Sequence, residues 1–586
     1  MTAAMSSLLF PTPRLREPLS GDPVAPTTAV QSATDSSLPP QGFVLSIDTG
    51  SLRLSHADAA GERYGRQLVA QLASQHPDGI PPQRIEDSPD FPIRGYMLDI
   101  SRTRVPTRGT LERLVEILNL CRINHLELYT EHTFAYREHE PVWRDASPMT
   151  ADDLRWLDRL CLANGIELSA NQNCFGHMER WLSRPAYRSR AECPDGWTSM
   201  LAGNMPPAVL APTQANADFA VALVREMLAS LTSRRVNIGC DETFELGRGA
   251  SHADVAGRGR GRVYLDHLQR LIAPLRDDGC EVLFWGDILR NHPELVGELP
   301  RDNALALVWH YEMPIDPDSL PPALLQVGAE FGITADVLRG FRGQIGAFAD
   351  SGFPHWVCPG TSSWNSFVGR LGNARANLLD AAAVGRESGA RGYLITDWGD
   401  SGHLQPPSVS WPPLLYGAGL SWCAESNRDL DIAATLDRFV FADDSGRLGR
   451  SLVQVGDAYS RTGQLGFNAS PLFTAVVRRG LLGALGMPQA NALGSLIEDL
   501  EHCSAAIASS QPRCRDGAIV RRELRQAIAL ARHGALRLLH EAGGSAPADT
   551  EMRRDLDDRI AEQRVCWLMR SRAGGLEESL GRLRPD

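Results

Sequence analysis

The chain has 586 residues, of which 43% are hydrophobic and 22% are charged, and these ordinary proportions allow a large buried core. Its formal net charge of −12 and its pI of about 5.7 argue against a surface that binds nucleic acid or anionic membranes. No apolar run approaches the roughly 20 residues that are needed to cross a bilayer.

The start of the chain and the cysteines indicate where the protein works. The first residues contain a short apolar patch broken by prolines and lack the basic and apolar regions of a secretory signal. Eleven cysteines are scattered without a CxxC pair, which suits reduced thiols better than a disulfide framework. We therefore predict a cytoplasmic protein.

The first 90 residues divide into two segments. Residues 1–40 are rich in Pro, Ser, Thr and Ala, and this composition predicts disorder. In residues 41–90, the alternation of FVLSIDTGSLRLS predicts a hairpin, and AAGERYGRQLVAQLAS has helical periodicity. Because this is too short for a full domain, we expect a small α/β cap.

Residues 91–425 alternate short β-rich runs with amphipathic stretches. The β-rich runs lie at 94–101, 124–131, 166–173, 235–242, 281–287, 304–312, 355–363 and 392–400. Eight strands alternating with helices predict a (β/α)8 TIM barrel, which would be the catalytic domain. An open doubly wound sheet is the rival fold, but no GxGxxG turn or P-loop supports it.

Residues 426–586 lose the β signal. RRELRQAIALARHGALRLLHEA and its neighbours have apolar residues at helical spacing beside charged faces. We expect a helical C-terminal region that packs either on the barrel or on a second copy of the chain, which would make a homodimer.

The predicted strands end in residues that carry chemistry. In a barrel, the C-terminal ends of the strands form the face where active sites lie. The fourth strand, in VNIGCDETFELGRG, ends in adjacent carboxylates, Asp241 and Glu242. The second ends in Glu131, the third leads to His177 and the first begins at Arg94. As a structural alternative, the two adjacent carboxylates would only cap the next helix.

The last four strands each bring a tryptophan to the same face: Trp285, Trp309, Trp364 and Trp398. Apolar faces of a sugar ring stack on indole, while charged side chains hydrogen-bond its hydroxyls. Each tryptophan taken alone has a second interpretation as a core residue. Together they predict the wall of a pyranose pocket.

Four segments, RGYMLDISR, FGHMERW, VNIGCDETF and YLITDWGD, resemble the β-N-acetylhexosaminidases of glycoside hydrolase family 20. LELYTEHTFAY is most similar to their hexosaminidase D branch. The resemblance covers residues 85–410 and implies a retaining exo-hydrolase that removes a terminal β-linked GlcNAc or GalNAc from a glycan or glycoconjugate. It also implies that the 2-acetamido oxygen of the substrate is the nucleophile, that an oxazolinium ion is the intermediate and that no cofactor is used.

The same resemblance implies roles for individual residues. Glu242 would protonate the leaving oxygen and later activate water, and Asp241 would orient the acetamido group and stabilise the oxazolinium charge. Tyr311 would grip the acetamido carbonyl, and His177 would lie near the acid. The other expected sugar contacts are Arg94, Glu131 and Asp400.

Two other functions remain open: a hydrolase with an O-GlcNAcase-like or larger glycan substrate, and a catalytically weak or inactive sugar-binding barrel. Paired aspartates would mark the first, and loss of Asp241 or Glu242 would mark the second. Strand 2 departs from the family pattern because it ends in Glu131-His132, where many relatives have Asp-Asp. No HExxH-like spacing supports a metal site, and none is expected.

Overall fold

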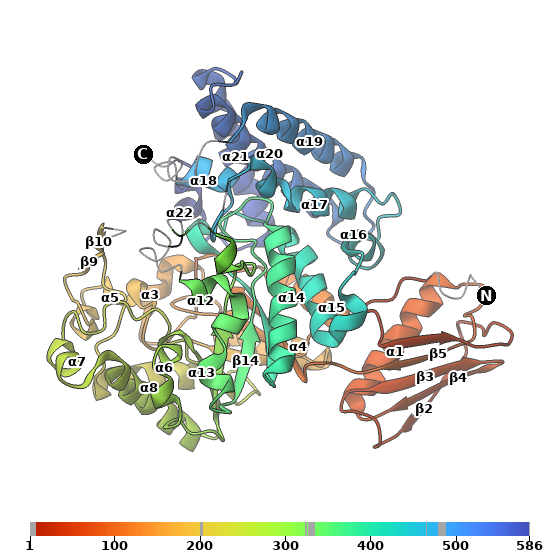
Figure 1. Ribbon diagram of the computed structural model, residues 1–586, viewed down its shortest axis with the longest axis horizontal. Coiled ribbons are helices and arrows are strands. Elements are labelled where there is room, and N and C mark those ends of the chain that lie inside the picture. Colours follow the sequence, from red (N-terminus) through yellow and green to blue (C-terminus); the bar gives the residue numbers. More distant parts are fainter. Residues whose placement is uncertain are drawn as a thin grey trace.

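The chain forms three parts in sequence order, a sheet domain, a barrel and a helical region (Figure 1). The computed structural model describes residues 7–199, 203–320, 322, 325, 334–464, 466–478 and 488–584. No helix in these residues combines the length and the apolar character that a membrane crossing requires. All eleven cysteines are free thiols.

The N-terminal domain is a five-stranded sheet covered by one helix. Its strands have the order β1-β5-β3-β4-β2, and the predicted hairpin and helix are both present. The elements are β1 (Leu15–Pro18), β2 (Val30–Thr34), β3 (Phe43–Asp48), β4 (Ser51–His56), α1 (Ala59–Gln75) and β5 (Gln83–Asp87).

The prediction of disorder for residues 1–40 is wrong for residues 7–40. β1 pairs with β5 and β2 pairs with β4, while Leu9 and Phe10 are buried in hydrophobic clusters. Both strands lie at sheet edges, where partner strands supply the hydrogen bonds that the sequence of the edge strand does not reveal. Residues 1–6 lie outside the described part of the chain.

Parallel strands close the barrel and confirm the predicted (β/α)8 fold. Eight strands in the described residues form it, and it closes through the pairing of β8 with β11. They are β6 (Ile93–Asp99), β7 (His125–Tyr129), β8 (Glu167–Asn171), β11 (Arg235–Asn237), β12 (Glu281–Trp285), β13 (Ala304–Trp309), β14 (His355–Cys358) and β15 (Gly392–Asp397).

Amphipathic helices surround this barrel. The first buries Leu111, Leu114 and Val115 on one face, and the side chain of Thr107 caps its start. The larger helices are α2 (Arg108–Leu120), α4 (Ala151–Ala163), α6 (Gln214–Leu228), α8 (Arg260–Asp277), α14 (Leu371–Glu387) and α15 (Trp411–Asn427). Shorter elements in the loops are α3 (Glu140–Trp143), α5 (Glu179–Leu182), β9 (Trp197–Ser199), β10 (Gly203–Met205), α7 (His252–Arg258), α9 (Asp287–Arg290), α10 (Pro293–Val296), α12 (Ala335–Leu338) and α13 (Gly346–Ala349).

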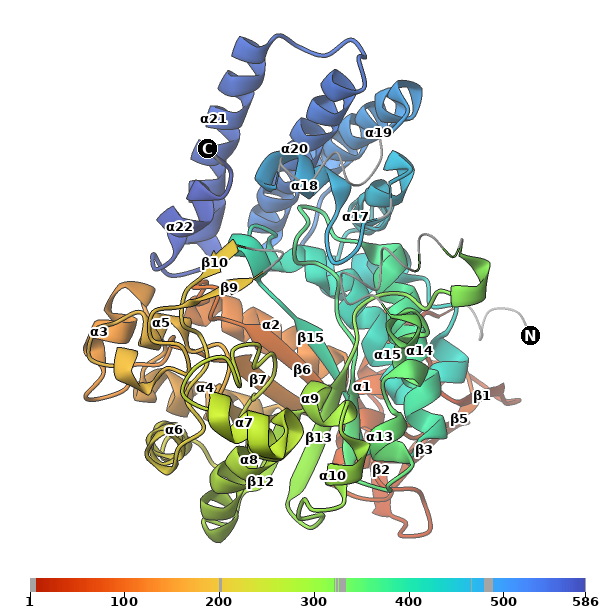
Figure 2. The same ribbon diagram turned by 60° about the vertical axis from the view of Figure 1, so that its left-hand side comes forward.

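The C-terminal helices pack on the barrel within the same chain (Figure 2). They are α16 (Ile432–Thr435), α17 (Leu448–Gly456), α18 (Pro471–Val477), α19 (Ala490–Ser509), α20 (Gly517–Glu541), α21 (Asp549–Arg570) and α22 (Leu576–Gly581). The carbonyl of Arg570 accepts hydrogen bonds from the amide of Thr107 and the hydroxyl of Thr110. The end of α21 is therefore fixed to the loop that follows the first barrel strand.

Candidate active site

A cavity of about 130 Å³ opens at the C-terminal ends of the barrel strands. Its walls come from the loops after six of the strands and from one residue of the C-terminal helical region. The lining residues are Arg102, His177, Asp241, Glu242, Trp309, Tyr311, Trp364, Trp398, Asp400 and Asn468.

An irregular turn after β11 brings the paired carboxylates into this cavity. Gly239, Cys240 and Glu242 have φ of +67°, +73° and +48°, values that only a small fraction of non-glycine residues adopt. The next helix, α7, begins only at His252. The alternative in which the carboxylates cap a helix is therefore wrong.

Two glycines let the backbone approach closely around the turn. A Cβ at Gly239 would lie 1.7 Å from Oδ1 of Asn173, and a Cβ at Gly176 would lie 2.3 Å from the carbonyl oxygen of Asp241. Any larger residue at either position would push the loop after β8 away from the carboxylates. The loop that carries His177 is held beside them in this way.

His177 is the common counter-ion of three carboxylates. Its Nε2 lies 3.2 Å from Oδ2 of Asp241 and 3.5 Å from Oε2 of Glu242, and its Nδ1 lies 3.8 Å from Oε1 of Glu131. Burial opposes the charged imidazolium, but the Asp241, Glu242 and Glu131 charges outweigh this and raise the pKa of His177 to about 10. The ring therefore carries a positive charge at neutral pH.

The two adjacent carboxylates have different surroundings. The side chain of Glu242 is 40% exposed toward the pocket mouth, whereas that of Asp241 is 9% exposed. Removal from bulk water raises the pKa of Glu242; the His177 charge opposes this rise and the Asp241 charge adds to it. Because Glu242 remains partly exposed, solvent moderates the rise. Oδ1 of Asp241 is buried and accepts no hydrogen bond from the described residues, so it is available to a ligand.

Asp287 is a third carboxylate beside this pair, and the sequence analysis did not single it out. Its Oδ2 accepts a hydrogen bond from the backbone amide of Glu242 at 3.2 Å. Burial and the charge of Asp241 raise the pKa of Asp287 to about 7. Below that pH, Asp287 anchors the turn without adding a further negative charge.

Arg102, three residues after the end of β6, is a second cationic group at the pocket. Its guanidinium nitrogens lie 3.3 Å from Asp99, 3.3 Å from Glu131 and 3.6 Å from Asp400, and the group lies 5.3 Å from the centre of the Trp398 ring. The sequence analysis missed this residue, although it ends the RGYMLDISR segment.

Arg94 does not reach the pocket, so its prediction as a sugar contact is wrong. It lies near the start of β6, at the opposite end of the barrel. Its guanidinium donates to the carbonyl oxygens of Arg122 and Phe91 and to the hydroxyl of Tyr64 and lies 4.9 Å from the centre of the Trp422 ring. It joins the barrel to the N-terminal sheet domain.

Three of the four predicted tryptophans line the cavity, together with Tyr311. Trp309 stacks on Tyr311 at 5.1 Å, and the Trp364 indole donates to Oδ1 of Asn468. Trp285 instead lies beneath Trp398, in the hydrophobic cluster inside the barrel. The prediction of Trp285 as a wall residue is wrong, because its side chain fills the layer below the pocket.

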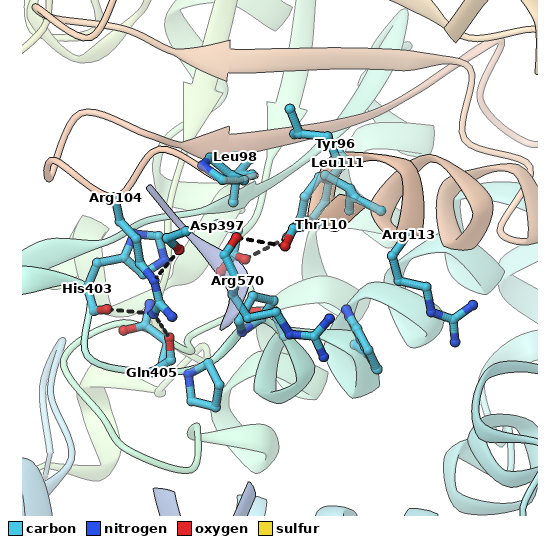
Figure 3. Close-up of a pocket in the computed structure, with 17 residues that line it drawn as sticks. Tyr96, Leu98, Arg104, Thr110, Leu111, Arg113, Asp397, His403, Gln405 and Arg570 are labelled. Carbon is cyan, nitrogen blue, oxygen red and sulfur yellow. Dashed lines mark hydrogen bonds between the residues drawn. The ribbon is translucent and has the colours of Figure 1, made fainter. Parts of the chain in front are cut away.

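A second cavity, of about 40 Å³, lies between the barrel and α21 (Figure 3). This volume holds only a few water molecules. Arg570 beside it is paired with Asp516 and Glu523, and Arg104 donates to the carbonyl oxygens of His403 and Gln405. The cavity is therefore part of the packing contact between α21 and the barrel, and it is too small to be a sugar site.

The C-terminal helical region also contacts the loop after β15, which carries Trp398 and Asp400. Gln563 of α21 donates to the carbonyl oxygen of Leu404, and Arg478 donates to the hydroxyl of Ser401. The C-terminal region thus supports one wall of the pocket. Within the described residues, no three His, Cys, Asp or Glu side chains come together in a group that could hold a metal ion.

Comparison with known proteins finds a family model for the N-terminal domain and distant relatives for other parts of the chain. Residues 3–88 match the family model "Glycosyl hydrolase family 20, domain 2". The curated relatives include a β-hexosaminidase of Akkermansia muciniphila, 28% identical over 23% of this chain and 31% of that protein. They also include hexosaminidase D of Homo sapiens, 24% identical over 53% of this chain and 61% of that protein. Residues 3–88 thus match a domain of glycoside hydrolase family 20, and further parts of the chain are similar to β-hexosaminidases.

Solved structures of other proteins share the fold of this chain. A chitobiase of Flavobacterium johnsoniae aligns with a TM-score of 0.55 and 13% identity over 98% of this chain and 99% of that one. An exo-β-N-acetylglucosaminidase of Vibrio harveyi, solved with N-acetylglucosamine, aligns with a TM-score of 0.55 and 15% identity over 76% of this chain and 78% of that one. The chain spans about a third to three fifths of the length of the two curated relatives named above.

Proposed function

We propose that this chain is a retaining exo-β-N-acetylhexosaminidase that removes terminal β-linked GlcNAc or GalNAc by substrate-assisted catalysis. The observation that carries the proposal is the pair Asp241 and Glu242 on one turn, both within 3.5 Å of His177. Glycosidases with a protein nucleophile place two carboxylates on opposite sides of the bond, about 5 Å apart. Adjacent residues on one turn do not flank a glycosidic bond in that way, so the nucleophile is assigned to the acetamido oxygen of the substrate.

The different exposure of the two carboxylates supports different roles. Glu242, at the pocket mouth, protonates the departing oxygen and then removes a proton from the incoming water. Asp241, deeper and with a free Oδ1, accepts from the acetamido N–H and stabilises the positive charge of the oxazolinium ion. His177 keeps both carboxylates oriented. Tyr311 holds the acetamido carbonyl between the rings of Trp309 and Trp364.

The outer hydroxyls of the sugar are assigned to the charged group on the other side of the pocket. Arg102 takes the role that the sequence analysis gave to Arg94. Asp400 is partly exposed beside Arg102, so both can bind hydroxyls of a terminal ring. Glu131 lies behind them and links Arg102 to His177.

The test is release of nitrophenol from nitrophenyl β-glycosides of GlcNAc and GalNAc. We expect hydrolysis of at least one of them, with the β-configuration retained in the first sugar released. The matching nitrophenyl glucoside, which lacks the acetamido group, is expected to be inert. Failure of both N-acetyl substrates, or equal hydrolysis of the glucoside, would contradict the proposal.

A matched pair of arginine variants tests the assignment of Arg102. Arg102→Lys keeps the charge but cannot span three carboxylates, so we expect kcat/KM to fall by about 10- to 100-fold, the range for one charged hydrogen bond. Arg94→Lys is expected to lower the free energy of unfolding by about 1 to 3 kcal/mol and to leave kcat/KM unchanged. Kinetics and denaturant unfolding of both proteins check this. The reverse pattern would return the sugar-binding role to Arg94.

A further inference from the structure

A large aromatic side chain stands exposed beside the proposed acid. Phe244 is 53% exposed, and its backbone amide donates to the carbonyl oxygen of Glu242 at 2.7 Å. The Cα atoms of residues two apart are separated by at most about 7 Å. Single exposed apolar residues are common on protein surfaces, so the position of Phe244, and not its exposure alone, calls for an explanation.

Phe244 is exposed although the loop around it is well packed. Its neighbours Thr243 and Leu246 are both buried. Arg260 donates to the carbonyl oxygen of Thr243, and Arg248 donates to that of Phe244 at 3.0 Å. The backbone on both sides of the ring is therefore fixed while the ring itself faces solvent.

A buried carboxylate secures the rest of the loop. Glu192 accepts hydrogen bonds from the amides of Gly247, Gly249 and Ser251, and from the hydroxyl of Ser251. A Cβ at Gly249 would lie 1.9 Å from the carbonyl oxygen of Glu192, so the two backbones are in close contact. A buried charge is retained only when such hydrogen bonds compensate its desolvation. The loop is thus built rigidly around an exposed ring.

The position of the acid determines what this ring meets. A general acid must lie within hydrogen-bond reach of the oxygen that it protonates, so the leaving group starts at Glu242 and extends outward from the pocket. Phe244 follows the acid by two residues, and its side chain is exposed to solvent. We propose that Phe244 is a platform for the leaving group, on which the apolar face of a pyranose ring stacks, so that the natural leaving group is a further sugar. This inference rests on the proposed function.

The experiment compares two substrates that need similar protonation but differ in the ring of the leaving group. They are the β-linked disaccharide of N-acetylglucosamine and methyl β-N-acetylglucosaminide. We expect Phe244→Ala to lower kcat/KM for the disaccharide by about tenfold, the scale of one ring contact, and to leave kcat/KM for the methyl glycoside unchanged. Phe244→Trp should restore the disaccharide value. Leu568→Ala, at an exposed apolar residue on α21, should alter neither value.

Equal losses on both substrates would show that Phe244 acts through the fold and would overturn the inference. No loss on the disaccharide would also overturn it. In both cases, hydrolysis of the methyl glycoside by the wild-type protein would leave the proposed function standing. If the wild-type protein cleaves neither substrate nor the nitrophenyl glycosides, the proposed function itself fails, and the inference fails with it.

Discussion

Glu242→Gln is expected to lower kcat/KM for substrates with sugar leaving groups by about 10²- to 10⁴-fold, the range that general acid–base catalysis contributes. A sugar alkoxide leaves poorly without a proton, whereas a dinitrophenolate leaves without one, so bond cleavage in the dinitrophenyl glycoside should be affected much less. The measurement is kcat/KM for both substrates with the wild-type and the variant protein. An equal, small loss on both would remove Glu242 from the acid role.

The dependence of kcat/KM on pH gives a second test of Glu242→Gln. The pKa of Glu242 is raised, so the group keeps its proton to higher pH than an ordinary glutamate and activity falls as the pH rises through that pKa. Glutamine cannot titrate, so the variant should lose this alkaline decline. Glu245→Gln is the matched control, because Glu245 is a buried carboxyl on the same loop that does not line the pocket. Glu245→Gln should keep the wild-type dependence of kcat/KM on the leaving group and on pH.

Asp241→Asn is expected to weaken binding of a thiazoline analogue of the oxazolinium ion by about a hundredfold. The wild-type site should bind this mimic far more tightly than plain N-acetylglucosamine, because it complements the charge that develops during the reaction. Asn keeps the shape of the side chain but removes the negative charge that faces the positive ring, and a charged hydrogen bond contributes about 1.5 to 3 kcal/mol.

Two inhibition constants for each protein decide the outcome. If both ligands lose the same factor in Asp241→Asn, Asp241 is a general sugar contact. If the wild-type protein shows no preference for the thiazoline, substrate assistance is wrong for this chain. Asp287 would then be the first carboxylate to examine as a protein nucleophile, since it is the next one beside the pair.

The barrel was predictable from the sequence because its signal is repeated. Each strand run is short and rich in apolar residues and leads to polar or aromatic residues at its end, and the helices between the runs have clear amphipathic spacing. β1 and β2 were missed because an edge strand of four or five residues has too little pattern of its own. The partner strands that stabilise them come later in the chain.

The pocket was predictable only in part. The adjacent carboxylates Asp241 and Glu242 are recognisable in the sequence because buried strands rarely end in two acidic residues. Whether the other predicted residues line the pocket depends on the direction of their side chains. Arg94 and Arg102 belong to the same segment, yet only Arg102 lies at the C-terminal end of the strand. Trp285 ends its strand but points into the barrel. Asn468 reaches the pocket through tertiary packing of the helical region, and no local sequence pattern predicts that contact.

The contacts of α21 and α22 with the loop after β15 affect when the pocket can form in a newly synthesised chain. Ser579 of α22 donates to the carbonyl oxygen of Gly402, just beyond Trp398 and Asp400. Chains grow from the N-terminus, so the eight barrel strands are synthesised well before this contact exists. A nascent chain that has finished its barrel still lacks the support for one wall of the pocket. This wall of the pocket therefore gains its full support only after α22 has been synthesised, well after the barrel strands.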